Sequence, residues 1–165
     1  MPHVHIRPAE PADLPAITAI YDHAVRTGTA TFELDPPDLA EITSRYETLK
    51  AGDFPYIVAI MEDVVVGYAY AGAWKTRSAF RYCVETAIYV DQGAMGTGVG
   101  SALYRELIAG LKARSIHSLI AAITVPNAPS VAFHQKFGFR PVGHFAQVGW
   151  KLDRWIDVSY WELIL

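Results

Sequence analysis

The chain has 165 residues and a formal net charge of −3, and about half of its residues are apolar. That length suits one domain with a proper hydrophobic core, so we expect residues 1–165 to form a single domain. The negative charge argues against nucleic-acid binding, and we see neither an apolar signal segment nor an apolar run of membrane-spanning length. The single cysteine, Cys83, cannot form an internal disulfide, which is typical of a reducing compartment. We therefore expect a cytoplasmic protein.

Periodic patterns divide the chain into strands and helices. Apolar residues at a spacing of three or four indicate helices, and short runs rich in β-branched and aromatic residues indicate strands. Gly28 follows the first helical pattern, and Asp38 with Glu41 resembles a capping box that opens the second. In chain order the expected elements are a strand at residues 3–7, helices at 12–25 and 39–52, strands at 56–61, 64–74 and 82–90, a helix at 99–113, a strand at 118–124, a helix at 129–137, and strands at 139–149 and 155–165.

This order predicts an α/β domain, in which helices cover both faces of a mixed sheet. Residues 118–124 form an apolar run without alternation, as expected for a strand that is covered on both faces. The unit from Tyr82 to Thr124 is strand, helix, strand, and it predicts a right-handed parallel crossover. The loop inside this unit then lies at the carboxyl end of a strand, where open α/β sheets bind ligands.

The stretch from Glu85 to Ser101 carries the clearest functional signal. An apolar strand with one carboxylate leads into a loop with four glycines, and a helix follows at once. Glycines let backbone N–H groups converge on a phosphate, and a helix N-terminus favours negative charge. The loop lacks the lysine of a Walker A motif, and its spacing G-x-x-G-x-G differs from the Rossmann fingerprint. We expect a phosphorylated ligand with a carboxylate beside it.

The segment after Val90 resembles the acetyl-CoA loop, Q/R-x-x-G-x-G/A, of the GCN5-related N-acetyltransferases (GNAT). The matching residues are Met95-Gly96-Thr97-Gly98-Val99-Gly100. Three further segments look like the phosphinothricin acetyltransferase branch of this superfamily, and they occur in the right order: Ala73–Glu85, Val125–Phe139 and Gly149–Val158.

The resemblance implies a fold, an activity and partners. The GNAT fold has a mixed, mostly antiparallel sheet of about seven strands with helices on both faces. The branch moves acetyl from acetyl-CoA to the α-amine of a small amino acid analogue, such as phosphinothricin, methionine sulfoximine or methionine sulfone, by direct attack in a ternary complex. Acetyl-CoA would be the co-substrate, no metal would be needed, and the protein would be a homodimer.

Two residues are candidates for proton transfer. Glu85 is a lone carboxylate in an apolar strand, and the resemblance puts the catalytic base of the branch at this position; a partly buried carboxylate of raised pKa could take the proton of an ammonium. The structural alternative is an ion pair with Arg77 or Arg81. His134 lies where most of the superfamily has a tyrosine that protonates the departing thiolate, and the branch has histidine there. Its alternative is a structural histidine bonded to a backbone carbonyl.

The resemblance also implies the binding residues. Asn127 would bond the pantetheine arm of CoA and cap a helix, and the backbone after Glu85 would pair with the arm as an added strand does. The expected cofactor site comprises Ile88, Tyr89, Val90, Met95, Gly96, Thr97, Gly98, Val99, Gly100, Ser101 and Asn127. The expected substrate site comprises Phe32, Trp74, Arg77, Arg81 and Glu85, in which arginine forks suit an acid group and ordinary packing is the alternative.

One departure from the family pattern concerns charge. The family usually has basic residues around the loop, whereas residues 92–96 carry none, and charge-assisted contacts to phosphate are the stronger kind. A distant cation such as Lys136 or Arg140 would have to substitute. Two other functions therefore stay open: a CoA-binding or sensing module with little catalysis, and acetylation of protein N-termini or lysines. The aromatic C-terminal region, with Trp150 and Trp161, could form a dimer interface or core.

Overall fold

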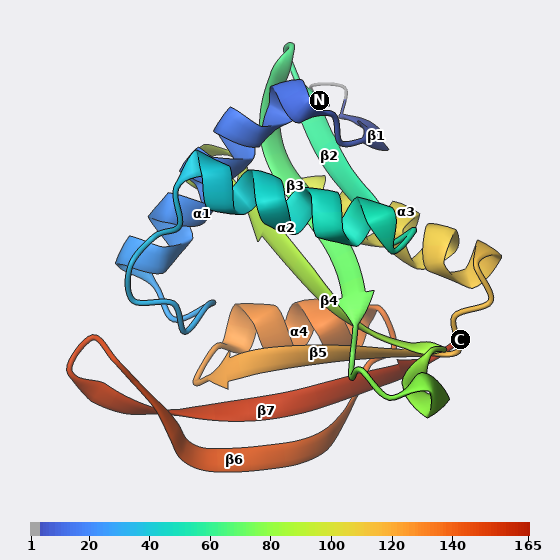
Figure 1. The fold of residues 1–165 in the computed structure, drawn as a ribbon. Coiled ribbons are helices and arrows are strands. Elements are labelled where there is room, and N and C mark those ends of the chain that lie inside the picture. Colours follow the sequence, from blue (N-terminus) through green and yellow to red (C-terminus); the bar gives the residue numbers. More distant parts are fainter. Residues whose placement is uncertain (1–3) are drawn as a thin grey trace.

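Seven strands form one mixed sheet in the order β1-β2-β3-β4-β5-β7-β6 in the computed structural model, which describes residues 4–165 (Figure 1). All neighbouring strands are antiparallel except β4 and β5, which are parallel. This confirms the predicted α/β class and the mostly antiparallel sheet. The strands are β1 (His5–Pro8), β2 (Tyr56–Met61), β3 (Val64–Ala73), β4 (Cys83–Val90), β5 (Ser118–Val125), β6 (Arg140–Lys151) and β7 (Arg154–Ile164).

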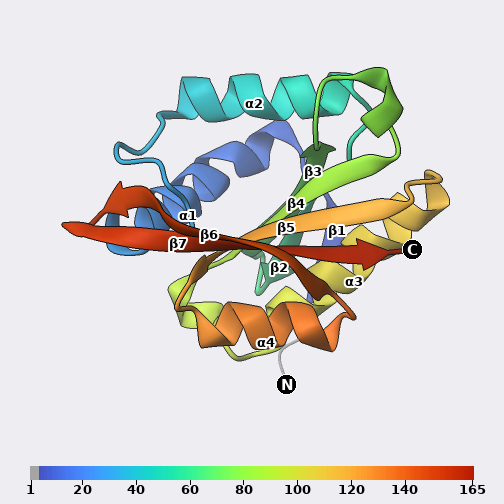
Figure 2. The same ribbon diagram turned by 90° about the horizontal axis from the view of Figure 1, so that it is seen from below.

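Helices cover both faces of the sheet. They are α1 (Leu14–Thr27), α2 (Leu39–Ala51), α3 (Val99–Ala113) and α4 (Ala128–Lys136). Figure 2 shows α1 and α2 on one face and α3 and α4 on the other. Three short 3-10 turns, at Pro11–Asp13, Ser78–Phe80 and Gln92–Ala94, complete the elements of the described chain. No helix within residues 4–165 is long and apolar enough to cross a membrane.

The predicted elements occur in the predicted order, with ends displaced by one or two residues. The strand predicted at 3–7 is β1, which begins at His5, and His3 lies outside the described residues. The first helix begins at Leu14 rather than Ala12, because a 3-10 turn precedes it. The Asp13 carboxylate accepts the backbone N–H of Glu10 at 2.8 Å and thereby fixes this turn.

Two local predictions need correction. The Asp38 carboxylate caps α2 by accepting the Glu41 N–H at 2.9 Å, but the return half of the predicted capping box is missing, because Glu41 pairs with Arg45 instead. The strand predicted to end at Gly149 continues to Lys151. Leu152 and Asp153 both have positive φ, 52° and 56°, so a two-residue turn joins β6 to β7 and the strands pair up to it. Neither residue is a glycine, so this turn could not be predicted from a glycine position.

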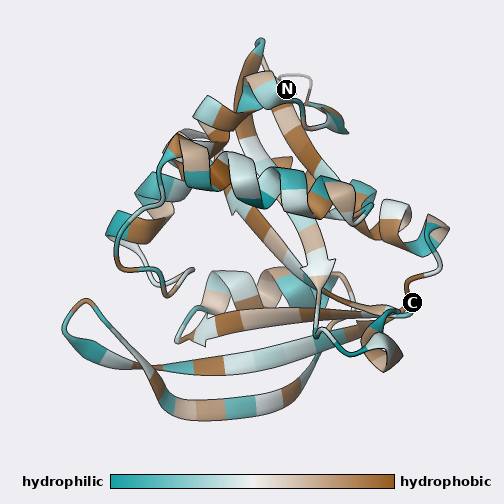
Figure 3. Ribbon diagram, in the orientation of Figure 1, coloured by the Kyte–Doolittle hydropathy of each residue, from teal (hydrophilic) through white to brown (hydrophobic). Residues whose placement is uncertain are grey.

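Two hydrophobic cores lie on opposite faces of the sheet. The predicted apolar stripe of α3 is buried against the sheet, with Leu103, Leu107 and Leu111 all 0 % exposed. The second core joins α1 and α2 to β2 and β3, and Ile17 and Val58 are fully buried in it. Figure 3 shows hydrophobic residues along β2, β4 and β5, and hydrophilic residues alternating with hydrophobic ones along α2. The helices therefore cover the central strands on both faces, whereas most residues of β6 remain exposed.

Leu107→Ala tests the α3 core. Removal of a fully buried leucine side chain leaves a cavity, and we expect a loss of about 2–5 kcal/mol in the free energy of unfolding. Leu34, which is 65 % exposed, is the matched control, and Leu34→Ala should stay within about 0.5 kcal/mol of wild type. Urea unfolding followed by circular dichroism measures both. Equal losses in the two variants would contradict the assigned core.

Candidate active site

The strands β4 and β5 pair only at their first residues. The parallel ladder joins residues 83–85 to residues 118–120 and stops there. Beyond that point β4 continues beside β3, and β5 continues beside β7, so the two strands separate as a fork (Figure 1). The ladder has no pair beyond Glu85 and Ile120, so the backbone N–H and C=O groups of residues 88–90 that face β5 have no strand partner there within the described chain.

A buried hydrogen-bond network holds the apex of the fork. The Thr86 hydroxyl lies 2.8 Å from the Tyr104 hydroxyl and 3.3 Å from the carbonyl oxygen of Ile120 on β5. Tyr104 is fully buried, and its ring packs among those of Phe133 and Phe139. Burial raises the pKa of Tyr104, so it remains a neutral phenol. The opening angle of the fork is therefore set by packed and bonded groups rather than by a loose loop.

A cavity of about 410 Å³ fills the fork and is lined by residues from both faces of the sheet. Glu85 and Tyr89 alternate along β4 with Thr86, so they lie on the face of α1, where the Tyr21 ring packs edge-on against Tyr89. From the other face Asn127 and His134 reach the cavity on α4. Two ligands could therefore meet in the sheet from opposite sides.

Glu85 is a half-buried carboxylate without a bonded partner. Within residues 4–165 it makes no hydrogen bond and no ion pair, so the pairing with Arg77 or Arg81 that sequence reasoning offered as a structural role does not occur. Burial raises the pKa of Glu85, and the charge of Lys75 opposes that shift in part. An unpaired carboxylate of raised pKa in a cavity is suited to accept a proton.

His134 is fixed through one nitrogen and free at the other. Its Nδ1 lies 2.8 Å from the carbonyl oxygen of Ser130, and because a carbonyl only accepts, Nδ1 carries the hydrogen. Nε2 makes no hydrogen bond in the described structure and is not completely buried. Since His134 lines the fork cavity, Nε2 is accessible from it. Burial lowers the pKa of His134, although the bond to Ser130 opposes this. The imidazole is therefore neutral at neutral pH.

The glycine loop forms an open backbone cradle at the start of α3. Gly96 and Gly98 have φ of 76° and 94°, a conformation that favours glycine, and a Cβ at either position would meet nothing within 4 Å. Gly98 precedes the first helical residue, Val99, and the N–H groups of Val99, Gly100 and Ser101 have no backbone partner within residues 4–165. The cradle fits a phosphate group. Met95 is 63 % exposed beside it, as expected for a loop that faces solvent.

A cation from another element reaches this cradle. The Lys136 ammonium on α4 lies 3.4 Å from the hydroxyl oxygen of Ser101, in the first turn of α3. Arg140, the other candidate substitute, is exposed on β6, with no side-chain contact to the loop in the described residues. Asn127 caps α4 by accepting the Ser130 N–H at 3.2 Å, as predicted. Lys136 therefore supplies the positive charge that the loop itself lacks.

The predicted substrate residues divide into two groups. Phe32 lines a second cavity, of about 360 Å³, which shares Thr31 and Thr124 with the fork cavity. Trp74 packs edge-on against Tyr160, a residue of that second cavity. Arg77 and Arg81 are exposed and line neither cavity. The cation near Glu85 is Lys75 instead, which lies over the Trp74 ring at 4.5 Å.

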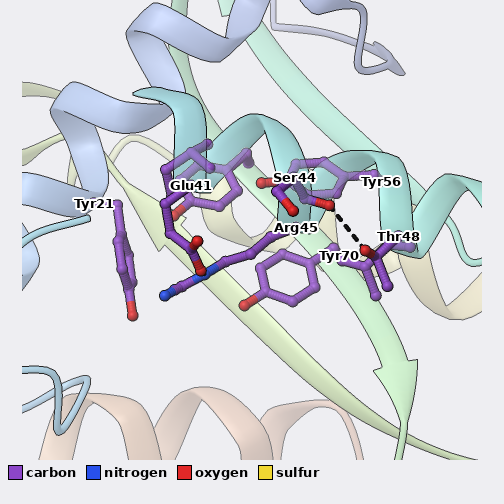
Figure 4. A pocket seen from close by; sticks show the side chains of 10 residues that line it. Tyr21, Glu41, Ser44, Arg45, Thr48, Tyr56 and Tyr70 are labelled. Carbon is purple, nitrogen blue, oxygen red and sulfur yellow. Dashed lines mark hydrogen bonds and ion pairs between the residues drawn. The ribbon is translucent and has the colours of Figure 1, made fainter. Parts of the chain in front are cut away.

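The structure contains a third cavity that the sequence analysis did not predict. It measures about 420 Å³ and lies under α2, where tyrosines of β2 and β3 surround Arg45 (Figure 4). Arg45 donates to Glu33 at 2.6 Å and to Glu41 at 2.8 Å. Tyr70 lines this cavity and the fork cavity alike, and burial raises the pKa of Tyr70 to about 12. Tyr68 and Tyr70 are two residues apart on one strand and therefore share a face, and this spacing was the sequence feature that could have indicated the cavity.

A forked sheet with a phosphate cradle on one face and a free carboxylate on the other suits a transferase that holds a phosphorylated donor on one side and an acceptor on the other. The comparisons agree with this class. A family model described as an acetyltransferase (GNAT) domain matches residues 6–160. The chain belongs to the GNAT acetyltransferases, and it is an acetyl-CoA-dependent acetyltransferase. Within residues 4–165 no three metal-ligating side chains gather.

Three similar proteins span nearly the whole chain. An L-methionine sulfoximine/L-methionine sulfone acetyltransferase of Pseudomonas aeruginosa is 38 % identical over 161 residues, which are 97 % of this chain and 94 % of the relative. The crystal structure of a phosphinothricin acetyltransferase of Sinorhizobium meliloti in complex with acetyl-CoA has a TM-score of 0.96 and 39 % identity, over 98 % of this chain and 88 % of that one. That of a ribosomal-protein-alanine N-acetyltransferase of Brucella melitensis has a TM-score of 0.95 and 40 % identity, over 98 % and 99 %.

Lys136→Met tests the substitute cation. Loss of a positive charge beside the phosphate cradle should raise the dissociation constant of acetyl-CoA roughly three- to tenfold, and it should weaken the dependence of binding on salt. Lys112→Met, at an exposed lysine in the last turn of α3, is the matched control and should bind as wild type does. Calorimetric titration at two salt concentrations measures the effect. Unchanged affinity would mean that the backbone cradle alone holds the phosphates.

Proposed function

We propose that this protein acetylates the α-amine of a small amino acid analogue, of the phosphinothricin, methionine sulfoximine or methionine sulfone type. The observation that carries the proposal is the free carboxylate of Glu85, which faces the fork cavity without any partner within residues 4–165 and has a raised pKa. A base of this kind is needed because the ammonium form of an amine has no lone pair with which to attack a thioester.

The residues of the chain divide the work. Acetyl-CoA supplies an activated acetyl group, and Lys136 with the N–H groups of residues 98–101 would hold its phosphates. The unpaired backbone of residues 88–90, with Asn127, would bind the pantetheine arm, and one of its N–H groups would polarise the thioester carbonyl. Glu85 would take the proton of the ammonium, and the amine would then form the C–N bond as the C–S bond breaks. Both ligands would be bound at once.

The proposed role of His134 is constrained by its protonation. A neutral imidazole with its hydrogen on Nδ1 presents only a lone pair at Nε2. His134 can protonate the departing thiolate only in its charged form, whose population is small at neutral pH because burial lowers the pKa. If His134 is the acid, kcat should therefore fall as the pH rises through that lowered pKa. Without such a fall, its part is to position the thioester.

The acceptor would enter from the face of α1 and α2. Phe32 lines the second cavity, and Trp74 packs against Tyr160, which lines it too. This cavity could take the side chain of the analogue. Lys75 is the candidate for the acid group, because its charge acts on Glu85, whereas Arg77 and Arg81 are exposed and line neither cavity. The thiol of Cys83 does not line the fork cavity, and burial raises its pKa, so we assign it no covalent intermediate.

Acetylation of protein N-termini is the second candidate. It is favoured by the likeness to the Brucella melitensis protein whose name describes a ribosomal-protein-alanine N-acetyltransferase. A protein substrate needs a path for a peptide chain, and the second cavity, which shares Thr31 and Thr124 with the fork cavity, is also lined by Phe145 and Val148 of β6. The two candidates differ in the acceptor and not in the chemistry, so one assay separates them.

The deciding experiment measures the release of free thiol from acetyl-CoA. The acceptors are phosphinothricin, methionine sulfoximine, methionine sulfone, plain amino acids and a peptide with an N-terminal alanine. We expect turnover on one or more of the analogues and a loss of about 10²–10⁴-fold in Glu85→Gln, with acetyl-CoA affinity unchanged. Because burial raises the pKa of Glu85, the acidic limb of the wild-type kcat/KM profile should lie above pH 4.5 and be absent in the variant.

The outcomes separate the hypotheses. Turnover confined to the peptide would replace the small-molecule assignment by protein acetylation. Acetyl-CoA binding without turnover on any acceptor would favour a sensing module, the alternative raised by the missing basic residues of the loop. Full activity of Glu85→Gln on the analogues would exclude Glu85 as the base.

We also propose a homodimer through the β6–β7 hairpin. Large apolar side chains are exposed there, among them Phe145 at 55 %, Trp150 at 51 % and Trp155 at 58 %. Monomeric proteins rarely expose a contiguous apolar patch of this kind, and a second copy would cover it. Sedimentation velocity should give the mass of two chains, and Trp155→Lys should shift the boundary toward one chain. A wild-type monomer at micromolar concentration would contradict the dimer.

A further inference from the structure

The connection between α1 and α2, residues 28–37, is here called the acceptor loop, because its Thr31 and Phe32 line the cavities around Glu85. Thr31 borders the fork cavity and the second cavity, and Phe32 borders the second. The loop holds no helix or strand, so its position depends on what it touches. Figure 1 and Figure 2 both show it beside the tip of the β6–β7 hairpin.

Lys151 of β6 is turned inward against this loop. It is 4 % exposed, although its neighbours Trp150 and Leu152 are 51 % and 52 % exposed. Its ammonium donates a hydrogen bond of 2.9 Å to the carbonyl oxygen of Thr31, the only hydrogen bond of this group within residues 4–165. Burial of an ammonium is unfavourable unless it is bonded, so this contact opposes any departure of the loop from the hairpin.

Gly149, two residues earlier on the same strand face, provides a seat for Phe32. A Cβ at Gly149 would lie 2.4 Å from Cζ and 2.6 Å from Cε2 of the Phe32 ring, which are closer than real Cβ contacts come. The ring thus packs directly on the backbone of β6. The pairing of β6 with β7 shifts register between Phe145 and Gly149, so Gly149 lies at the end of an irregular stretch of the strand.

Other elements hold the acceptor loop at further points. The Thr31 hydroxyl lies 2.8 Å from the hydroxyl of Tyr21 on α1, and Thr29 lies 3.1 Å from Thr124 on β5. Those bonds fix the inner side of the loop. Lys151 and Gly149 fix the outer side, where Phe32 meets the second cavity, and neither belongs to the residues that would bind acetyl-CoA.

We propose that Lys151 and Gly149 are positioning residues, which seat the acceptor loop against the β6–β7 hairpin and so set the shape of the acceptor pocket. The inference rests on the proposed function, because it takes the cavities around Glu85 as the place of the amine. Both residues act through the loop: Lys151 through the Thr31 carbonyl, and Gly149 through the Phe32 ring. They should affect the amine and leave acetyl-CoA alone.

Lys151→Met tests the first contact with two readouts. Methionine keeps the length of the side chain and removes the charge that holds Thr31. We expect amide hydrogen exchange of residues 29–34 to become roughly tenfold faster. We also expect the KM for the amine to rise about tenfold and the KM for acetyl-CoA to stay within about twofold. Lys112→Met, the exposed control, should leave both readouts as in wild type. Unchanged exchange and unchanged KM in Lys151→Met would overturn the proposal.

A double-mutant cycle tests the second contact and does not depend on the folding of Lys151→Met. Gly149→Ala should displace the Phe32 ring and raise the amine KM roughly fivefold or more. When Phe32 is already alanine, the added methyl group meets no ring, so Gly149→Ala should then change the amine KM by less than about twofold. Equal effects of Gly149→Ala in both backgrounds would show that Gly149 does not act through Phe32.

The two readouts separate failure of this inference from failure of the proposed function. If wild type turns over no amine, the proposed function fails, and hydrogen exchange alone still decides whether Lys151 and Gly149 hold the loop. If wild type is active and the variants match it in exchange and in amine KM, the positioning role fails while the function stands.

Discussion

The separation of β4 from β5 is the constraint on which the rest of the site depends. Each strand has a full antiparallel partner on its outer side, β3 for one and β7 for the other, and only residues 83–85 and 118–120 join them. The sheet is thus two antiparallel halves with a short parallel seam. The Thr86 and Tyr104 hydroxyls close the seam at its end. Where the two strands separate, backbone groups are left unpaired, and a ligand with amide groups can form hydrogen bonds with them as an added strand would.

This geometry provides separate faces of the sheet for the two ligands, acetyl-CoA and the amine. The cradle before α3, Lys136 and α4 lie on one face, while Glu85, the acceptor loop and the tyrosine-lined cavity lie on the other. The pKa of Glu85 stays raised because the carboxylate is partly buried and no cation bonds to it, and the charge of Lys75 opposes the rise only in part. His134 differs, because its Nδ1 is committed to Ser130 and its ring packs edge-on against Tyr104. Burial thus favours the neutral form of both groups: it raises the pKa of Glu85 and lowers the pKa of His134.

Local signals in the sequence predicted the elements well, since periodicity and glycine positions act over a few residues. The α3 stripe, the cradle before it and the cap at Asn127 were all predicted and are all present. The contacts of long side chains were harder. Lys136 could be named as a candidate but not chosen over Arg140, because the choice depends on how α4 lies beside α3. The inward turn of Lys151 follows from a turn without glycine and from the seat of Phe32, and no short pattern reports either.

The short parallel seam between β4 and β5 also separates two halves of the sheet that are synthesised one after the other. Strands β1 to β4 and helix α3 come from residues 5–113, and strands β5 to β7 with α4 come from residues 118–164. During synthesis the first segment leaves the ribosome with the cradle and Glu85 already encoded, but without the wall that closes the fork. The side of the fork cavity that is formed by β5 and α4 is absent until the last third of the chain has been made. A nascent or truncated chain that lacks β5 to β7 and α4 would have no enclosed place in which to bring a thioester and an amine together.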